Sequence, residues 1–312
     1  TLPKNIQVMY YRRKIILALL EALGKDVSAK SMQKYLFLFT RKQVGEKAFD
    51  FVPYKYGCFS FQANQDLLAL SKQGYLDIEK IERKDSLYHP LYETHFIGDL
   101  DMFDTQAIHE VCKLYGNMSQ NELIAYTYRT NPFTAINSTI AQYLLTKEEM
   151  GKVRECRERY KHSSSVLMTI GYEGFTLEKY LKQLICNDIR VLCDVRKNAF
   201  SMKYGFSKGI LQKACEGIGI KYIHVSALGI ESENRKALNT QEDYDRLFEE
   251  YEQTSLKQNW GALLYVRSVL DEEKRVCLTC FEKDPRQCHR TRVAKALMEL
   301  PNVTYDFQEI LL

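Results

Sequence analysis

From Ser163 onward, the sequence alternates short apolar runs with longer segments of helical spacing. The apolar runs predict buried strands at Val166–Ile170, Arg190–Arg196, Gly219–Val225, Val276–Cys280 and Val303–Phe307. The segments between and after them predict helices at Leu177–Ile185, Phe206–Glu216, Leu238–Thr254, Trp260–Leu270 and Cys288–Glu299. This alternation favours an α/β fold with a mainly parallel sheet and helices on both faces.

The first half of the chain has a different pattern. Apolar residues at helical spacing predict helices at Ile6–Leu23, Lys30–Val44, Phe61–Gln73, Asp104–Gly116 and Ser119–Arg129. Tyr75–Ile97 is typical of two strands joined by a charged turn. Three helices followed by a hairpin is the order of a winged helix, so we expect a mostly helical, winged-helix-like domain before the α/β domain.

A chain of 312 residues is long for one compact domain, which favours two. The densely charged segment Thr146–Tyr160 predicts a linker helix between them. We therefore expect a winged-helix-like binding domain at residues 1–145, a linker at 146–163 and an α/β domain at 164–312.

Composition narrows the setting. The apolar fraction of 45% and the charged fraction of 27% are ordinary for a globular protein. The net charge of +4 permits contact with nucleic acid but does not require it. Nine scattered cysteines follow no disulfide scaffold, which favours free thiols in a reducing cytoplasm. No apolar stretch approaches the roughly 20 residues that span a bilayer, so we expect neither a signal peptide nor contact with a membrane.

Polar residues gather at the C-terminal ends of three predicted strands. They are Tyr172 and Glu173 after the first, Asp194 and Arg196 at the second, and Cys280 and Glu282 after the fourth. The C-terminal ends of parallel strands lie at one edge of a sheet, where α/β proteins bind their ligands. We therefore expect these side chains to form one pocket.

The segment from Cys280 to Arg290 carries the reactive groups. A thiolate at Cys280 or Cys288 would be stabilised by the N-terminus of the following helix and by nearby arginines, whereas the alternative is a cysteine that packs as a small hydrophobic residue. Cys280 or Cys288 is thus the candidate nucleophile, and Glu282 or His289 the candidate for proton transfer.

Arginines at the same edge predict a phosphate-binding site. Arg196 and Arg290 are the candidates for holding the anion. Asp194 and Arg196 lie two apart on a strand and share a face, so they either bind each other or grip a polar ligand. In the polar loop Lys197–Gly205, four residues can close over a ligand: Asn198, Ser201, Lys203 and Tyr204.

A zinc site is disfavoured by the spacing of its possible ligands. Cys277 and Cys280 lie three apart on a strand and point to opposite faces, and the adjacent Cys288 and His289 make an awkward chelate. We therefore predict no metal, and the sequence indicates no particular cofactor. A redox pair between Cys280 and Cys288 stays open.

The C-terminal half resembles the bacterial family known as domain of unknown function 488. The resemblance runs from about Val166 to Leu297 and is carried by six groups of residues: Thr169–Phe175, Leu192–Arg196, Asn198–Ser201 with Gly205–Ser207, Gly219–Tyr222, Leu228–Gly229, and Cys280–Pro285 with Cys288–Arg290. It implies an α/β fold and a bacterial intracellular setting, and it implies no reaction.

The first 130 or so residues resemble Panacea (SocA-like) antitoxin-type domains. The motifs are Met32–Leu38, Phe49–Ser60, Gly74–Leu76 and Ser119–Ile124. The resemblance implies a module that binds nucleic acid or a protein partner. Lys55 and Tyr56 are candidate nucleic-acid contacts, and their alternative role is to pack the loop against the hairpin.

The order of a strand ending in Asp-Val-Arg, a strand ending in Cys, and a helix that starts with Arg is also similar to rhodanese-like sulfurtransferases and cysteine phosphatases. Those proteins cradle an anion in backbone N–H groups above a reactive cysteine. Here the loop is longer, contains Pro285 and lacks the expected glycine.

Three functions stay open at this stage. The first is a nucleic-acid-associated protein, in DNA or RNA processing, repair or phage defence, with a phosphate- or nucleotide-binding pocket. The second is a thiol-dependent transferase or hydrolase of a small molecule. The third is a ligand sensor or protein-interaction module without catalysis.

Overall fold

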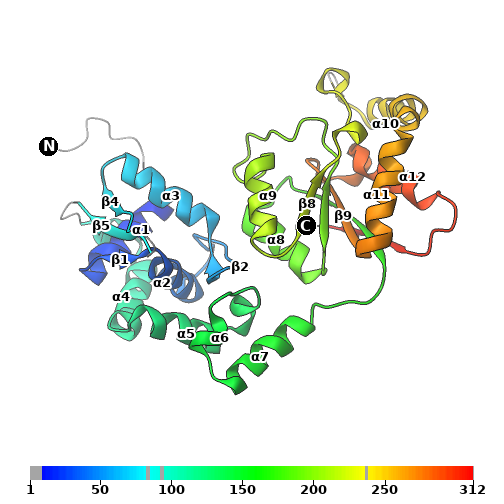
Figure 1. Cartoon of the computed structure of the whole chain (residues 1–312). Helices are drawn as coiled ribbons and strands as arrows, with labels where there is room; N and C mark the ends of the chain where they lie inside the picture. Colours follow the sequence, from blue (N-terminus) through cyan, green and yellow to red (C-terminus); the bar gives the residue numbers. More distant parts are fainter. Residues whose placement is uncertain (1–8, 82–84, 92–94, 236–237, 312) are drawn as a thin grey trace. The chain divides into compact units, whose positions relative to one another are not determined.

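The computed structural model describes residues 9–81, 85–91, 95–235 and 238–311. The chain divides into two compact units, an N-terminal unit (Thr1–Glu158) and a C-terminal unit (Arg159–Leu312) (Figure 1). The division falls within the charged segment that the sequence predicts as a linker. Within the described ranges, no helix is both long and apolar enough to cross a membrane.

The N-terminal unit is mostly helical. Its helices are α1 (Tyr11–Leu23), α2 (Ala29–Lys42), α3 (Phe61–Lys72), α4 (Met102–Tyr115), α5 (Gln120–Thr130), α6 (Ala141–Leu144) and α7 (Lys147–Glu158). Side-chain caps fix several helix starts, because Ser28 and Ser60 accept hydrogen bonds from the first turns of α2 and α3. Ser119 and Glu122 form a reciprocal capping box at α5. The part of the predicted first helix at residues 6–8 lies outside the described residues.

Two small antiparallel sheets complete this unit. One has the order β1–β5–β4, from Val27–Ser28, Leu87–Pro90 and Leu76–Glu79. The other is the hairpin of β2 (Val52–Tyr54) and β3 (Gly57–Phe59). Gly57 has a φ of +93°, and a Cβ there would lie 2.5 Å from the Tyr128 ring, so this turn requires glycine.

The C-terminal unit contains a five-stranded sheet in the order β10–β6–β9–β7–β8. The strands are β6 (Val166–Gly171), β7 (Val191–Asp194), β8 (Lys221–His224), β9 (Arg275–Cys280) and β10 (Asp306–Ile310). Every neighbouring pair is parallel, which confirms the predicted fold class. The last strand starts three residues later than expected, because Asn302 has a positive φ and Asp306 is the first residue in register with β6.

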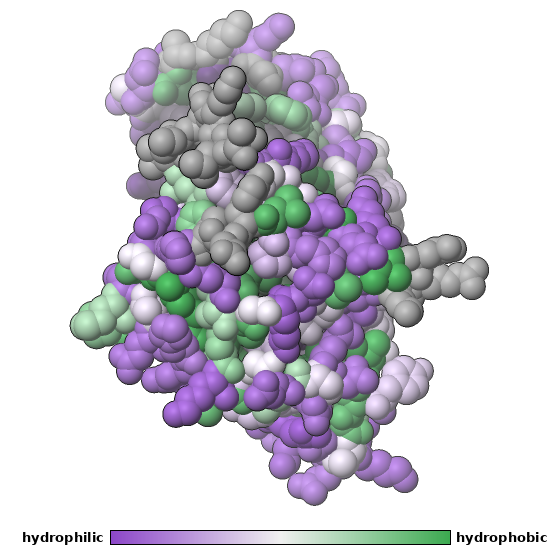
Figure 2. All heavy atoms as spheres, turned by 90° about the vertical axis from the view of Figure 1, so that its left-hand side faces the viewer, coloured by the Kyte–Doolittle hydropathy of each residue, from purple (hydrophilic) through white to green (hydrophobic). Residues whose placement is uncertain are grey.

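Helices cover both faces of this sheet (Figure 1). They are α8 (Leu177–Cys186), α9 (Lys208–Glu216), α10 (Gln241–Tyr251), α11 (Trp260–Glu273) and α12 (His289–Met298). Alternate residues of the strands, such as Val276 and Leu278, pack against α10–α12 in one apolar core, and this period of two assigns the intervening Cys277 to the other face. On the surface shown in Figure 2, hydrophobic residues form small groups separated by hydrophilic ones.

Candidate functional site

The C-terminal ends of β6, β9 and β7 lie level with one another. Gly171 of β6 pairs with Cys280 of β9, and Asp194 of β7 pairs with Thr279 of β9. The chain after β6 continues this pairing, since the Tyr172 N–H donates to the Cys280 carbonyl. Polar residues that are more than a hundred positions apart in sequence therefore meet at one edge of the sheet.

A pocket of about 250 Å³ opens at this edge. Six residues predicted from the sequence line it: Tyr172, Arg196, Asn198, Ser201, Cys280 and His289. Five further residues that were not predicted also line it: Lys197, Phe200, Ile230, Arg235 and Phe281. The pocket thus combines a thiol, an imidazole and two guanidinium groups.

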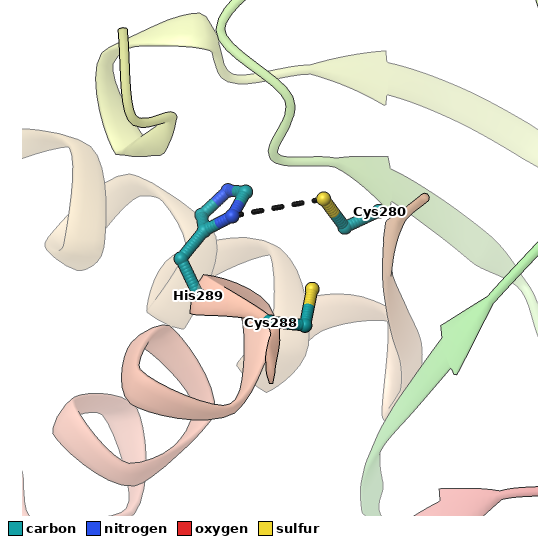
Figure 3. A group of neighbouring side chains, drawn as sticks. All are labelled: Cys280, Cys288 and His289. Carbon is teal, nitrogen blue, oxygen red and sulfur yellow. Dashed lines mark hydrogen bonds between the residues drawn. The ribbon is translucent and has the colours of Figure 1, made fainter. Parts of the chain in front are cut away.

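Cys280 lies at the end of β9 among groups that exchange protons with it (Figure 3). Its sulfur is 3.2 Å from Glu282 Oε2 and 3.6 Å from His289 Nδ1. Burial acts against a thiolate, but the hydrogen bond from Cys288, the contact with His289 and the charge of Arg235 hold the pKa of Cys280 well below that of an ordinary thiol.

The pKa values of two neighbours of Cys280 are raised rather than lowered. Burial and the adjacent Cys280 sulfur raise the pKa of Cys288, which therefore keeps its proton and donates it to Cys280. Burial and Cys280 also raise the pKa of Glu282. Glu282 can accordingly hold a proton beside a Cys280 thiolate, which avoids two adjacent negative charges.

His289 is the first residue of α12, and both of its ring nitrogens have partners. Nε2 lies 2.9 Å from the Val195 carbonyl, to which it donates, and Nδ1 lies 2.6 Å from Arg235 Nη2. Burial favours the neutral imidazole, whereas the Cys280 thiolate outweighs burial and raises the pKa of His289. In the observed arrangement Arg235 donates to Nδ1, so the imidazole is neutral there. Protonation of Nδ1 requires the guanidinium to move away.

Arg235 connects these groups. It ends the short 3-10 segment Ser232–Arg235 that follows β8, and it also donates through Nη1 to Glu282. Burial would lower the pKa of Arg235, but Glu282 and Cys280 raise it, so the guanidinium stays charged. Arg235 was not predicted from the sequence, because it does not follow β8 directly and another short 3-10 segment, Ser226–Leu228, lies between them.

Asp194 and Arg196 form a buried ion pair. Arg196 Nε donates to Asp194 Oδ1 at 2.9 Å, and Nη2 donates to Oδ2 at 2.5 Å. The Tyr222 hydroxyl donates to the same Oδ2 at 2.6 Å, and Arg196 Nη1 donates to the Tyr172 hydroxyl at 2.7 Å. Asp194 itself is fully buried and does not line the pocket. Its role is to orient the Arg196 guanidinium.

Three other predicted site residues hold the loops around the pocket. Glu173 accepts a hydrogen bond from the Lys283 N–H at 2.9 Å, and Lys203 Nζ donates to the Tyr172 carbonyl at 3.1 Å. Arg290 is buried and donates to the carbonyls of Glu282 and Lys283. None of the three lines the pocket.

Four backbone N–H groups of the loop from Phe281 to Cys288 already donate to acceptors within the protein, so these four cannot cradle an anion. The N–H groups of Lys283 and Arg286 donate to the carboxylates of Glu173 and Asp284. Those of Gln287 and Cys288 donate to carbonyls within the loop. In this respect the site differs from the rhodanese and phosphatase layout, and an anion here would be held by side chains.

Cys280, Cys288 and His289 could hold a metal ion, because their ligand atoms lie within 4.8 Å of one another. The adjacent Cys288 and His289 thus approach one point despite their expected awkward geometry. The Nδ1 lone pair, however, already accepts from Arg235, and the guanidinium charge would repel a cation. A metal ion would have to displace Arg235.

The fold and the site define a parallel α/β domain with a thiol-lined pocket at the C-terminal edge of its sheet. Residues 176–297 match the family model described as "Domain of unknown function DUF488". The matched segment includes β7, β8, β9 and most of α12, and thus most of the pocket. No curated protein matches the chain.

Lys55 and Tyr56 belong to the N-terminal unit, where they form the tip of the β2–β3 hairpin. Both are exposed. The Lys30 ammonium lies 4.7 Å from the centre of the Tyr56 ring.

Proposed function

We propose that the C-terminal unit is a thiol-dependent enzyme that binds a phosphate-bearing ligand in the pocket and attacks it with Cys280. The observation that supports this most directly is the position of the Cys280 sulfur, which is on the pocket wall, 3.6 Å from His289 Nδ1 and beside Arg235. A thiolate is the nucleophilic form of cysteine, and this surrounding favours it.

The balance of charge indicates the kind of phosphate. Arg196 is paired with Asp194, and Arg235 faces the one negative charge that Cys280 and Glu282 share, so each guanidinium charge is largely neutralised. A guanidinium has five N–H donors, and the observed bonds leave some of them for a ligand. Directed donors with little net charge suit a singly charged phosphodiester better than a doubly charged monoester. The internucleotide linkage next to the end of a nucleic acid supplies this group.

The residues divide the reaction between them. Arg196 and Arg235 orient the phosphate oxygens, and Cys280 attacks phosphorus and displaces an alkoxide or phenolate. Protonated Glu282 or His289 gives its proton to the leaving oxygen. Water then cleaves the thiophosphate ester, which releases the remaining phosphomonoester and restores the Cys280 thiolate, and the proton lost by the water returns to Glu282 or His289.

The full-length protein tests this with bis(4-nitrophenyl) phosphate as the phosphodiester and 4-nitrophenyl phosphate as the monoester. We expect faster release of 4-nitrophenolate from the diester, and none with Cys280→Ser. Cys112→Ser, on α4 of the N-terminal unit, is the matched control and should keep full activity. Equal release by wild type and Cys280→Ser refutes the nucleophile.

The third possibility, a sensor without catalysis, makes a separate prediction. The diester would then slow alkylation of Cys280 by iodoacetamide without any release of nitrophenolate. That result would support ligand binding in the pocket and refute the proposed catalysis.

Nucleic-acid binding by the N-terminal unit is a second proposal, supported by the exposed Lys55 and Tyr56 at one hairpin tip. A lysine beside an aromatic ring suits a phosphate next to a base. We expect salt-dependent retardation of DNA or RNA in a gel, weakened by Lys55→Ala. Absence of retardation at low salt would leave protein docking, also implied by the Panacea resemblance, as the role of this unit.

A further inference from the structure

The N-terminal unit contains a second pocket, of about 190 Å³, between the start of α2 and the β2–β3 hairpin. Its walls include the aromatic residues Tyr54, Tyr56, Phe59 and Tyr88. Lys34, on α2, lines the same pocket and is 1% exposed. A cavity with aromatic walls and a buried ammonium group is a typical arrangement of a small-ligand site.

The Lys34 ammonium has no negatively charged partner among the described residues. Its Nζ donates to the carbonyls of Tyr56 at 2.6 Å and Cys58 at 3.2 Å. Within the described part of the chain, these are its hydrogen bonds, and an ammonium has three donors. Burial raises the pKa of Cys58, so the neighbouring sulfur is a neutral thiol. Burial also lowers the pKa of Lys34 and outweighs the effect of the Asp85 carboxylate, which raises it without forming an ion pair with the ammonium.

The pocket is positively charged as a whole. Three lysines line it, Lys30, Lys34 and Lys55, against one carboxylate, Asp85. Asp85 accepts a hydrogen bond from the backbone N–H of Lys30 at 2.7 Å, so it stabilises the start of α2. A carboxylate in the pocket would supply the ion-pair partner that Lys34 lacks among the described residues.

We propose that this pocket binds an aromatic carboxylate, with the carboxylate on Lys34 and the ring between the tyrosine and phenylalanine side chains. One remaining ammonium donor matches one carboxylate oxygen, and the flat walls match a ring. The same chemistry is present in a free aromatic acid and in the C-terminal carboxylate of a peptide that ends in phenylalanine.

Benzoate and the uncharged benzamide are the probes, titrated into the full-length protein and followed by saturation-transfer NMR. We expect benzoate to bind with a Kd on the order of 1 mM. Benzamide should bind about tenfold more weakly, because it lacks the charge. Equal binding of the two, or no binding of benzoate, overturns the proposal.

Two variants locate the binding. Lys34→Met removes the cation and should abolish the preference for benzoate, whereas Lys72→Met, an exposed residue of α3, should leave it unchanged. Because Lys34→Met can also disturb folding, Ala29→Met provides a second test. Ala29 lines the pocket at the first turn of α2, and the larger side chain should block benzoate without changing any charge. Benzoate binding that survives both variants refutes the site.

A short peptide ending in phenylalanine identifies the source of the carboxylate. Tighter binding of the free-acid peptide than of benzoate, with loss on amidation, assigns the pocket to a chain terminus. Weaker binding of the peptide than of benzoate assigns it to a free acid.

Discussion

Replacement of Asp194 by Asn tests the buried ion pair that orients Arg196. Asn keeps the shape of Asp and one carbonyl oxygen, but an NH2 group replaces Oδ2. In the wild type two donors bond to that oxygen, Arg196 Nη2 and the Tyr222 hydroxyl, and in the variant both face the NH2 group. Each lost bond to a charged group costs about 1.5–3 kcal/mol. The total of about 3–6 kcal/mol overlaps the usual cost of about 3–5 kcal/mol for removing one partner of a buried pair. Since domains are stable by only about 5–15 kcal/mol, the C-terminal unit should become marginally stable.

Urea unfolding provides the assay. Trp260, the one tryptophan of the chain, lies on α11 and reports on the C-terminal unit. Asp245→Asn is the matched control, because Asp245 is exposed and its ion pair with Arg292 spans 3.8 Å, so we expect a change below about 0.5 kcal/mol.

A double variant distinguishes loss of the Asp194–Arg196 ion pair from a general loss of stability. Adding Arg196→Met to Asp194→Asn removes the unpaired cation, so the double variant should be less destabilised than the sum of the two single variants by about 2 kcal/mol or more. Additive effects, or a cost of Asp194→Asn below about 1 kcal/mol, would refute the reasoning.

Two further perturbations have defined outcomes. The pKa of Asp188 is lowered, because hydrogen bonds from Lys161 and the His162 N–H outweigh the opposing effect of burial. The stability that ionised Asp188 contributes to the fold is therefore present at neutral pH. It is lost as the pH falls through the depressed pKa, below about 4. Asp188→Asn should cost about 1–2 kcal/mol at pH 7 and flatten the loss of stability in acid, as measured by urea unfolding at several pH values. At Gly171 a Cβ would lie 1.8 Å from the Glu282 carbonyl oxygen, so Gly171→Ala should displace the loop and slow alkylation of Cys280. Gly209→Ala, in open space on α9, should not, and equal rates for the two variants would contradict this.

The sequence was sufficient to predict the parallel sheet, because strands buried on both faces appear in a sequence as continuous apolar runs that alternate with helical segments. The two-residue strand β1 was missed, since Val27–Ser28 is too short for any periodic signal and exists through pairing with Leu87 and Tyr88 of β5. The strand-end rule brought Tyr172, Arg196 and Cys280 to one pocket, as the register of the sheet requires.

The division of roles within the site could not be predicted in the same way. Arg235 lies in an irregular segment, and its bonds to Glu282 and His289 depend on a loop path that no periodic pattern encodes. Arg290 was expected to bind an anion, whereas the structure directs its guanidinium to loop carbonyls. The direction of a long side chain depends on tertiary packing, and a helix start indicates only where that side chain begins.

The ionisation of Cys280 at neutral pH is the central claim, and the pH dependence of its alkylation measures it directly. Iodoacetamide labelling of the full-length protein, quantified by mass spectrometry for each cysteine, gives the rate at Cys280 beside those at Cys112 and Cys186. We predict a rate at Cys280 that has already reached its plateau at neutral pH, because the pKa of Cys280 lies well below that of an ordinary thiol. A rate at Cys280 that rises about tenfold per pH unit up to roughly pH 8.5, as for an ordinary thiol, would contradict the account.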